Sequence, residues 1–243
     1  MIELINDDCL KAMPGLKDKS IDLILTDPPY GRTENKWDQA VDMGAVWQEW
    51  NRIIKDNGAI LVFADIKFAV RVISENKKLF RYEWVVEKGN ATGFLNARRM
   101  PLKAHDIVLT FYKHLPTYNP QFEQGNPYQH KRSGSHSSNY GEVNLRWTTN
   151  SPDGKRFPRD VIKYKNGHNG HPTGKPADLM AYFIKTYTNK GDTVLDCFMG
   201  SGSTGAAAIQ THRNFIGIER EQKYFALAKS NIERVKHDLS NQA

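Results

Sequence analysis

Cysteine is nearly absent from this chain of 243 residues, which contains only Cys9 and Cys197. Two cysteines cannot build a disulfide framework, so the sequence favours a reducing compartment. Long hydrophobic runs are missing too, because no stretch reaches the roughly 18 apolar residues of a membrane-spanning helix. The first five residues lack the basic and long apolar regions of a signal peptide. We therefore expect a cytoplasmic protein.

The sequence also lacks the residue spacing of a metal site. Its eight histidines are scattered, and His168 and His171 form the closest pair. Together with the two cysteines they give no convincing set of metal ligands. We expect no bound metal.

Acidic residues are outnumbered by basic ones, which gives a net charge of +7 and a pI near 9.3. Such a charge fits a polyanion partner, since Lys and Arg displace counterions from nucleic acid phosphates. A merely solvated basic surface would give the same composition. Charge alone does not decide between the two.

The hydrophobic pattern divides the chain into three zones. Residues 1–114 and 171–243 alternate strand-like and helix-like segments, whereas residues 115–170 show little periodicity. We expect strands at Ile2–Asn6, Ile21–Thr26, Ala59–Phe63, Tyr82–Glu87, Asp106–Tyr112, Thr193–Cys197 and Asn214–Ile218. We expect helices near residues 43–54, 66–73, 177–187, 204–211 and 222–236.

This alternation predicts an α/β fold with a mostly parallel sheet and helices on both faces. Tyr82–Glu87 and Asp106–Tyr112 follow each other without a clear helix between them, so they are expected to pair antiparallel at one edge. The helix near residues 43–54 is expected to end at Asn57 and Gly58, where glycine suits the left-handed position after a helix.

The middle zone, residues 115–170, could be a disordered linker. It nevertheless interleaves many aromatic and basic side chains, which is unusual for a linker and suits contacts to a nucleic acid backbone and bases. These residues are Tyr118, Phe122, Tyr128, Tyr140, Trp147, Phe157 and Tyr164, with Lys131, Arg132, Arg146, Lys155, Arg156 and Arg159.

The tetrapeptide Asp27-Pro28-Pro29-Tyr30 directly follows an apolar strand. Ligands in open α/β sheets bind beyond the carboxyl ends of strands, so the motif stands where chemistry is expected. A carboxylate and a rigid carbonyl before proline form a pair of acceptors, and an amino group on a nucleobase offers two N–H donors. Tyr30 adds an aromatic face for stacking. The alternative is a proline-rich turn capped by Asp27.

A second motif joins Asp196, at the end of a strand, to a turn with Gly200 and Gly202. With Gly205 the turn satisfies a dinucleotide spacing, which keeps a nicotinamide site open as an alternative. A carboxylate at Asp196 suits an ammonium group better than a pyrophosphate. Glu219 ends the next strand, where an acidic residue can bind ribose hydroxyls. A surface carboxylate is the alternative there.

Two further segments have ordinary structural explanations when taken alone. His171–Pro176 reads as a turn and a helix start, and Asn6–Cys9 reads as a helix N-cap.

Taken together, these motifs resemble the amino-group DNA methyltransferases of the beta class, over about residues 1–114 and 171–243. Asp27–Tyr30 is similar to that family's catalytic Asp-Pro-Pro-Tyr, and Phe198, Gly200 and Gly202 match its Phe-x-Gly-x-Gly motif. The resemblance implies catalytic roles for Asp27, Pro28, Pro29 and Tyr30. It implies S-adenosylmethionine contacts by Asp8, Cys9, Asp27, His171, Thr173, Lys175, Pro176, Asp196, Phe198, Gly200, Ser201, Gly202, Ser203 and Glu219.

The resemblance also implies a fold. We expect a Rossmann-like, seven-stranded, mostly parallel sheet with an antiparallel edge hairpin and a circularly permuted motif order. The N-terminal strand would lie beside the strand that ends in Glu219. Residues 1–114 would form the catalytic half, residues 171–243 the S-adenosylmethionine-binding half, and residues 115–170 an irregular target-recognition insertion.

The implied activity is methylation of adenine N6 in duplex DNA, with the target base flipped out and stacked on the ring of Tyr30. Phosphate contacts are expected from basic residues of the edge hairpin and the insertion: Arg98, Arg99, Lys103, Lys131, Arg132, Arg146 and Arg156. An N4-cytosine enzyme shares the same design. A nicotinamide-linked oxidoreductase or a non-catalytic DNA-binding module leaves some motifs unexplained. The host would be a bacterium or a phage-infected cell, and a homodimer and a cognate restriction endonuclease stay open as partners.

Overall fold

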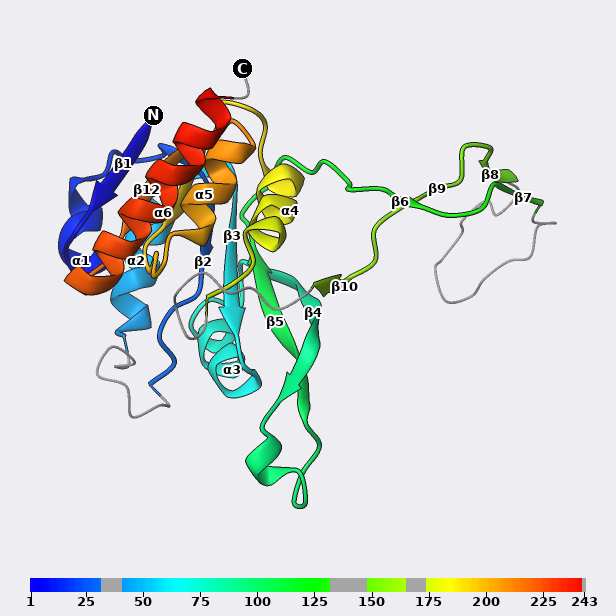
Figure 1. Cartoon of the computed structure of the whole chain (residues 1–243), viewed down its shortest axis with the longest axis horizontal. Coiled ribbons are helices and arrows are strands. Elements are labelled where there is room, and N and C mark those ends of the chain that lie inside the picture. The colour runs from blue at the N-terminus through cyan, green and yellow to red at the C-terminus, as the bar shows by residue number, and fades with distance from the viewer. Residues whose placement is uncertain (32–40, 132–147, 165–173, 242–243) are drawn as a thin grey trace. The chain divides into compact units, whose positions relative to one another are not determined.

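The computed structural model describes residues 1–31, 41–131, 148–164 and 174–241 (Figure 1). The chain forms two compact units, one made of Met1–Asn119 with Asp160–Ala243 and the other of Pro120–Arg159. No helix in the described ranges is long and apolar enough to span a membrane.

The larger unit is built on one sheet of eight strands. These are β1 (Ile2–Ile5), β2 (Ile21–Thr26), β3 (Ile54–Ala64), β4 (Phe80–Thr92), β5 (Lys103–Phe111), β10 (Val161–Tyr164), β11 (Thr193–Asp196) and β12 (Asn214–Ile218). Their order across the sheet is β1-β12-β11-β2-β3-β5-β4-β10. All neighbours run parallel except β5, which is antiparallel to both β3 and β4. The fold is therefore a Rossmann-like, mostly parallel sheet with one reversed strand.

Helices cover both faces of this sheet. One face carries α1 (Cys9–Ala12), α2 (Met43–Ile53) and α3 (Ile66–Glu75), and the other carries α4 (Ala177–Tyr187), α5 (Ser203–Gln210) and α6 (Gln222–Ser240). Figure 1 shows α4, α5 and α6 side by side. Short 3-10 turns stand at Met13–Gly15 and Phe94–Asn96.

The central strands are apolar without interruption because both of their faces are buried. In β3, Ile60 and Val62 pack in the core beneath α1, α2 and α3, whereas Leu61 and Phe63 pack in the core beneath α4, α5 and α6. Alternate side chains of a strand point to opposite faces, so a strand covered on both sides needs apolar residues at every position.

The sheet has eight strands rather than the seven expected from the sequence. The additional strand, β10, lies inside the zone that the sequence placed in the recognition insertion, and it pairs in parallel with β4 from Val161 to Tyr164. The β4–β5 hairpin is therefore next to the edge, and β10 is the edge strand. Strand β10 has only four residues, so it depends on its pairing with β4 and not on a hydrophobic pattern in its own sequence.

The expected helix end at Gly58 is wrong. Helix α2 ends at Ile53, and β3 begins at Ile54 without an intervening loop. Gly58 lies within β3, where a Cβ would stand 2.9 Å from the backbone oxygen of Asp22. Glycine is needed there for close approach of β3 to β2, at the register irregularity near Ile21 and Leu23.

The β4–β5 hairpin extends past the rest of the larger unit (Figure 1). Its tip turns at Gly93, which has the positive φ of 91° that glycine tolerates best. Phe94 and Leu95 follow and are 78% and 85% exposed. The hairpin thus carries apolar side chains to solvent instead of to the core.

The described part of the smaller unit contains two short ribbons. Strands β6 (Glu123–Gln124) and β9 (Lys155–Arg156) pair antiparallel, as do β7 (Tyr128–Lys131) and β8 (Thr148–Ser151). Phe122 packs on Phe157 at 5.0 Å between ring centroids. The unit therefore has a small structure of its own, which low periodicity in the sequence did not predict.

Candidate active site

Four acidic residues stand at the carboxyl ends of four neighbouring parallel strands. Asp8 follows β1, Glu219 follows β12, Asp196 ends β11 and Asp27 follows β2. The sheet order places these strands side by side, and β1 pairs with β12 as expected. Because ligands of open α/β sheets bind at this edge, the four strand ends form the candidate active site.

Asp27 is held by two donors, one on each carboxylate oxygen. The hydroxyl of Tyr30 donates to Oδ1 at 2.6 Å, and the ammonium group of Lys175 forms an ion pair with Oδ2. The side chain of Asp27 is 27% exposed and that of Lys175 is 16% exposed. The carboxylate is therefore fixed in orientation and still reaches the surface of the site.

Tyr30 is positioned by both ends of its side chain. Its ring packs against Phe68 of α3, with 4.9 Å between centroids and a tilt of 31°. Burial and the neighbouring Asp27 raise the pKa of the phenol well above its usual value, so the hydroxyl remains a neutral donor. The sequence singled out the ring of Tyr30 and missed the role of its hydroxyl.

The carboxylate of Asp196 is buried and hydrogen-bonded within the protein. Its Oδ1 accepts from the hydroxyl of Thr26 at 2.7 Å and from the Phe198 backbone at 3.2 Å, and its Oδ2 accepts from Thr204 at 2.6 Å. Only 4% of the residue is exposed, and this burial raises the pKa of the carboxyl to about 6. Asp196 thus joins β2, β11 and the start of α5, which places the catalytic and glycine motifs in one network.

Glu219 secures the glycine turn from the next strand. Its Oε2 accepts from the backbone of Gly200 and its Oε1 from Glu221, each at 2.8 Å. Burial raises the pKa of this carboxyl, although both backbone donors oppose the effect. Each oxygen keeps a further lone pair, so Glu219 can still accept from a ligand hydroxyl.

The glycine turn itself has room for a ligand. Gly200 and Gly202 have positive φ of 54° and 82°. A Cβ on Gly200 would meet no atom closer than 4.0 Å, so the backbone there borders open space, whereas one on Gly202 would press against Ala228 at 3.0 Å. The open turn and the acids beside it suit the ribose and ammonium groups of S-adenosylmethionine.

Of the other cofactor candidates, Asp8 and Pro176 lie within the described residues, whereas His171 and Thr173 do not. Asp8 caps α1, accepting from Leu10 at 2.9 Å, so the ordinary N-cap explanation of that segment holds. Pro176 follows Lys175 and is the N-cap residue of α4. His171 and Thr173 lie outside the described residues, as do the paired His168 and the DNA-contact candidates Arg132 and Arg146.

Neither cysteine has the environment of a nucleophile. Burial raises the pKa of the Cys9 thiol to about 12 and raises that of the Cys197 thiol well above its usual value. The sulfur of Cys197 accepts from the indole of Trp50 at 3.3 Å. Among the described residues no group of three His, Cys, Asp or Glu side chains could hold a metal.

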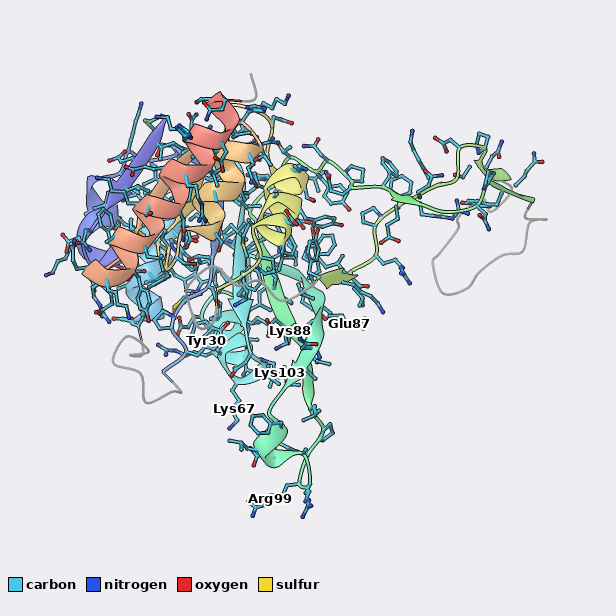
Figure 2. All side chains as sticks on the ribbon, in the orientation of Figure 1. Tyr30, Lys67, Glu87, Lys88, Arg99 and Lys103 are labelled. Carbon is cyan, nitrogen blue, oxygen red and sulfur yellow. The ribbon has the colours of Figure 1, made fainter. Side chains whose placement is uncertain are left out.

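Basic residues follow the hairpin toward its tip. In the view of Figure 2, Lys88 lies at about the level of Tyr30, Lys103 lies below it and Arg99 lies near the tip of the hairpin. Lys88 and Lys103 approach Asp106 at 3.3 and 3.6 Å. The sequence predicted Arg98, Arg99 and Lys103 of this hairpin as DNA contacts, and Lys88 of β4 lies on the same hairpin.

Arg156 has a structural role within the smaller unit. Its guanidinium lies 4.2 Å above the ring of Tyr128 and donates to the carbonyls of Asn126 and Gly154. Lys131 lies in β7 of the same unit.

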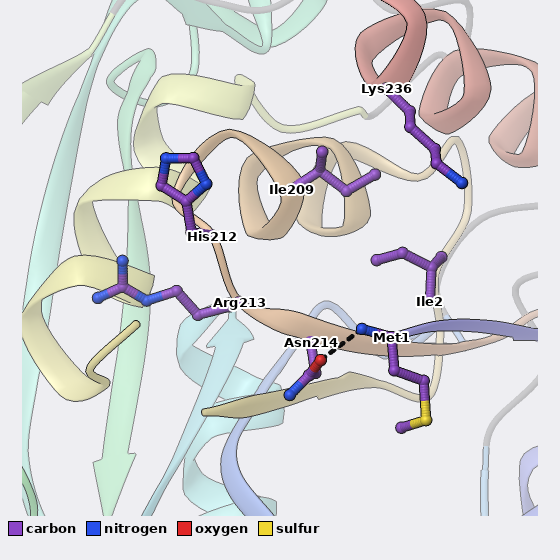
Figure 3. A pocket seen from close by; sticks show the side chains of 7 residues that line it. All are labelled: Met1, Ile2, Ile209, His212, Arg213, Asn214 and Lys236. Atoms are coloured by element: carbon purple, nitrogen blue, oxygen red, sulfur yellow. Dashed lines mark hydrogen bonds between the residues drawn. The ribbon is translucent and has the colours of Figure 1, made fainter. Parts of the chain in front are cut away.

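A pocket of about 270 Å³ lies at the amino ends of β1 and β12, opposite the ends that carry the acidic residues (Figure 3). It is lined by Met1, Ile2, Ile209, His212, Arg213, Asn214 and Lys236. The strands β1 and β12 begin there, whereas the acidic residues stand where they end. This pocket is therefore separate from the candidate active site.

Comparisons with known proteins agree with this geometry. The model of a family described as DNA methylase matches residues 21–230. The chain is 29% identical to the type II methyltransferase M.HinfI of Haemophilus influenzae, over 96% of the chain and 68% of that protein. The crystal structure of an M1.HpyAVI–SAM complex is similar, with a TM-score of 0.68, 25% identity and coverage of 96% and 99%. The PvuII DNA methyltransferase, named as cytosine-N4-specific, shares the fold with a TM-score of 0.69, 19% identity and coverage of 97% and 90%.

Proposed function

The chain belongs to the DNA methylase family, and on that premise we propose that it methylates the N6 amino group of adenine in double-stranded DNA. It is an S-adenosylmethionine-dependent DNA methyltransferase, in keeping with its family and with its similarity to the M1.HpyAVI–SAM complex. The choice of adenine rests on the resemblance of Asp27–Tyr30 to the Asp-Pro-Pro-Tyr motif of adenine enzymes.

The observation that carries the proposal is the placement of Asp27. Its carboxylate follows β2, next to the strand that ends in Asp196, and the hydrogen bond from Thr26 to Asp196 ties the two strand ends together. A target amino group and a methyl donor can therefore meet between neighbouring strands.

On the cofactor side, Glu219 would accept the ribose hydroxyls and the turn at Gly200–Gly202 would lie along the ligand. Three donors already bind the oxygens of Asp196, so this residue would attract the ammonium group through its charge. When bound, S-adenosylmethionine supplies an electrophilic methyl group on its sulfonium.

On the target side, the lone pair of an exocyclic amino group is delocalised into the ring and is a poor nucleophile. Asp27 and the carbonyl of Pro28 would accept its two hydrogens, which shifts electron density to nitrogen and aligns it for attack. The contribution is one of positioning and electrostatics. Since both cysteines are buried as thiols, no covalent intermediate on sulfur is expected.

The target base cannot be reached inside the duplex and must be flipped out. The β4–β5 hairpin, with Arg98, Arg99 and Lys103, would contact phosphates beside the site. The smaller unit, Pro120–Arg159, would read the sequence around the target.

An N4-cytosine activity is the second candidate, because cytosine offers the same pair of N–H donors and the PvuII enzyme shares the fold. Transfer of a tritiated methyl group to duplex DNA, followed by nucleoside analysis, separates the two. We expect the label in N6-methyladenine for the wild type, and equally for a Glu233→Ala control on the exposed side of α6. Label in N4-methylcytosine would overturn the choice of adenine while leaving the class of enzyme intact.

A further inference from the structure

The active site contains a largely buried cation that the catalytic motif does not include. Lys175 precedes α4, and its Nζ pairs with Oδ2 of Asp27 although 148 residues separate the two. The same ammonium group lies 4.9 Å from the ring centroid of Phe63 in β3. The ring and the carboxylate together hold it in one place.

Two further acidic groups act on Lys175 through their charge. They are Asp196, at the end of β11, and Asp106 of β5, which also approaches Lys88 and Lys103. Burial by itself would lower the pKa of Lys175, but Asp27, Asp106 and Asp196 reverse this and raise it. Lys175 is therefore charged and balances the acids.

Asp27 has acceptor capacity left in this arrangement. An ionised carboxylate offers about four lone-pair positions, and Tyr30 and Lys175 take one on each oxygen. Because the donors hold opposite oxygens, they fix the plane of the group and leave positions for an incoming N–H. Lys175 need not leave Asp27 for a target amino group to bind.

We propose that Lys175 is a positioning residue that orients the Asp27 carboxylate toward the target amino group, rather than a ligand of S-adenosylmethionine. This rests on the proposed function, because it assumes that Asp27 receives the target. It reassigns a residue whose motif alone suggested a cofactor contact.

The test compares Lys175→Met with Lys175→Arg, which keeps the charge, and with Lys185→Met, which removes an exposed lysine of α4. Single-turnover methyl transfer at saturating cofactor and DNA should fall about 10- to 100-fold in Lys175→Met, because misplacing a reacting group by about 1 Å has such an effect. Calorimetric affinity for S-adenosylmethionine should be unchanged. Lys175→Arg should recover much of the rate.

The split between the transfer rate and the cofactor affinity, together with rescue of the rate by arginine, is a readout that a merely structural lysine would not give.

Thermal unfolding without cofactor or DNA tests the pair independently of activity. Lys175→Met should lower the melting temperature by about 5 °C, since it leaves a partly buried carboxylate unpaired. Adding Asp27→Asn to that variant should restore part of the loss. If Lys175→Met folds poorly, Lys175→Gln is measured in its place.

Two results would overturn the inference. One is weaker cofactor binding with an unchanged rate at saturation, which would make Lys175 a cofactor ligand. The other is a Lys175→Met enzyme that matches Lys185→Met in its rate of methyl transfer. Failure of the proposed function is distinct, because the wild type would then transfer no methyl group to adenine.

Discussion

At the scale of single residues, the hydroxyl of Tyr30 has a defined task, since it donates to Asp27 at 2.6 Å. Tyr30→Phe removes that donor. A hydrogen bond to a charged group contributes about 1.5–3 kcal/mol, so the single-turnover rate should fall at least about 10-fold. Tyr30→Ala should lose roughly a further 1–3 kcal/mol of base stacking, which should appear in the kinetic and binding constants that depend on DNA.

Rapid-quench kinetics and fluorescence of 2-aminopurine at the target separate these effects. If Tyr30→Phe keeps the wild-type rate, the hydroxyl does not contribute and only the ring of Tyr30 has a role. Equal damage in both variants, in folded protein, would mean that the ring does not hold the base.

Asp196 makes stability and cofactor binding depend on pH in opposite directions. Burial raises its pKa from 3.8 to about 6, so the fold favours the protonated form. The stability that this group contributes is complete below about pH 4 and is lost as pH rises through about 6. Two pKa units correspond to about 3 kcal/mol, and the unfolding free energy of the wild type should drop by that order relative to Asp196→Asn.

Cofactor affinity should instead rise through the same window, because the carboxylate that attracts the ammonium group forms there. Denaturant titrations and calorimetry from pH 4 to about 8 measure both trends. Parallel curves for the wild type and Asp196→Asn would contradict the assignment.

At the scale of elements, the β4–β5 hairpin is expected to act through charge. Replacing Arg98 and Arg99 with alanine should weaken binding to all DNA sequences alike. The slope of log affinity against log salt concentration should become shallower by about 0.9 for each phosphate that the variant no longer neutralises. Lys229→Ala, on the exposed side of α6, is the matched control. Binding isotherms at several salt concentrations that overlay those of the control would remove the hairpin from the DNA interface.

Elements were predictable where their pattern is local. The strands ending before Asp27 and Glu219 and the helix at Ala177–Tyr187 follow from apolar runs and periodicity alone. Strand β10 did not, because four residues between polar segments become a strand only by pairing with β4. The direct passage from α2 to β3 was missed for a similar reason, since Gly58 resembles a helix end unless its contact with β2 is known.

At the scale of the whole molecule, the site could be predicted in part. Motifs at strand ends located Asp27, Asp196 and Glu219, because the carboxyl edge of a parallel sheet collects such residues. The Asp27–Lys175 pair and the bond from Tyr30 could not be derived, since they depend on side-chain positions that no spacing in the sequence encodes.

The division into units changes how the recognition region should be exchanged. The sequence suggested residues 115–170, but that range includes β10 of the main sheet. Replacing Pro120–Arg159 with the corresponding unit of a relative should preserve folding and move methylation to the relative's site. Replacing residues 115–170 should lower the melting temperature as well. Methylation mapping that finds the original site in the shorter chimera would place specificity elsewhere.

The central claim is that Asp27, at the end of β2, acts on the target amino group while other strand ends hold the cofactor. Single-turnover methyl transfer by Asp27→Ala, alongside calorimetry of S-adenosylmethionine binding, tests it most directly. We expect transfer below a few percent of the wild-type rate, roughly a loss of 2 kcal/mol or more, with cofactor affinity retained in a folded protein. A variant that keeps its rate, or that loses transfer only because the cofactor no longer binds, would contradict the account.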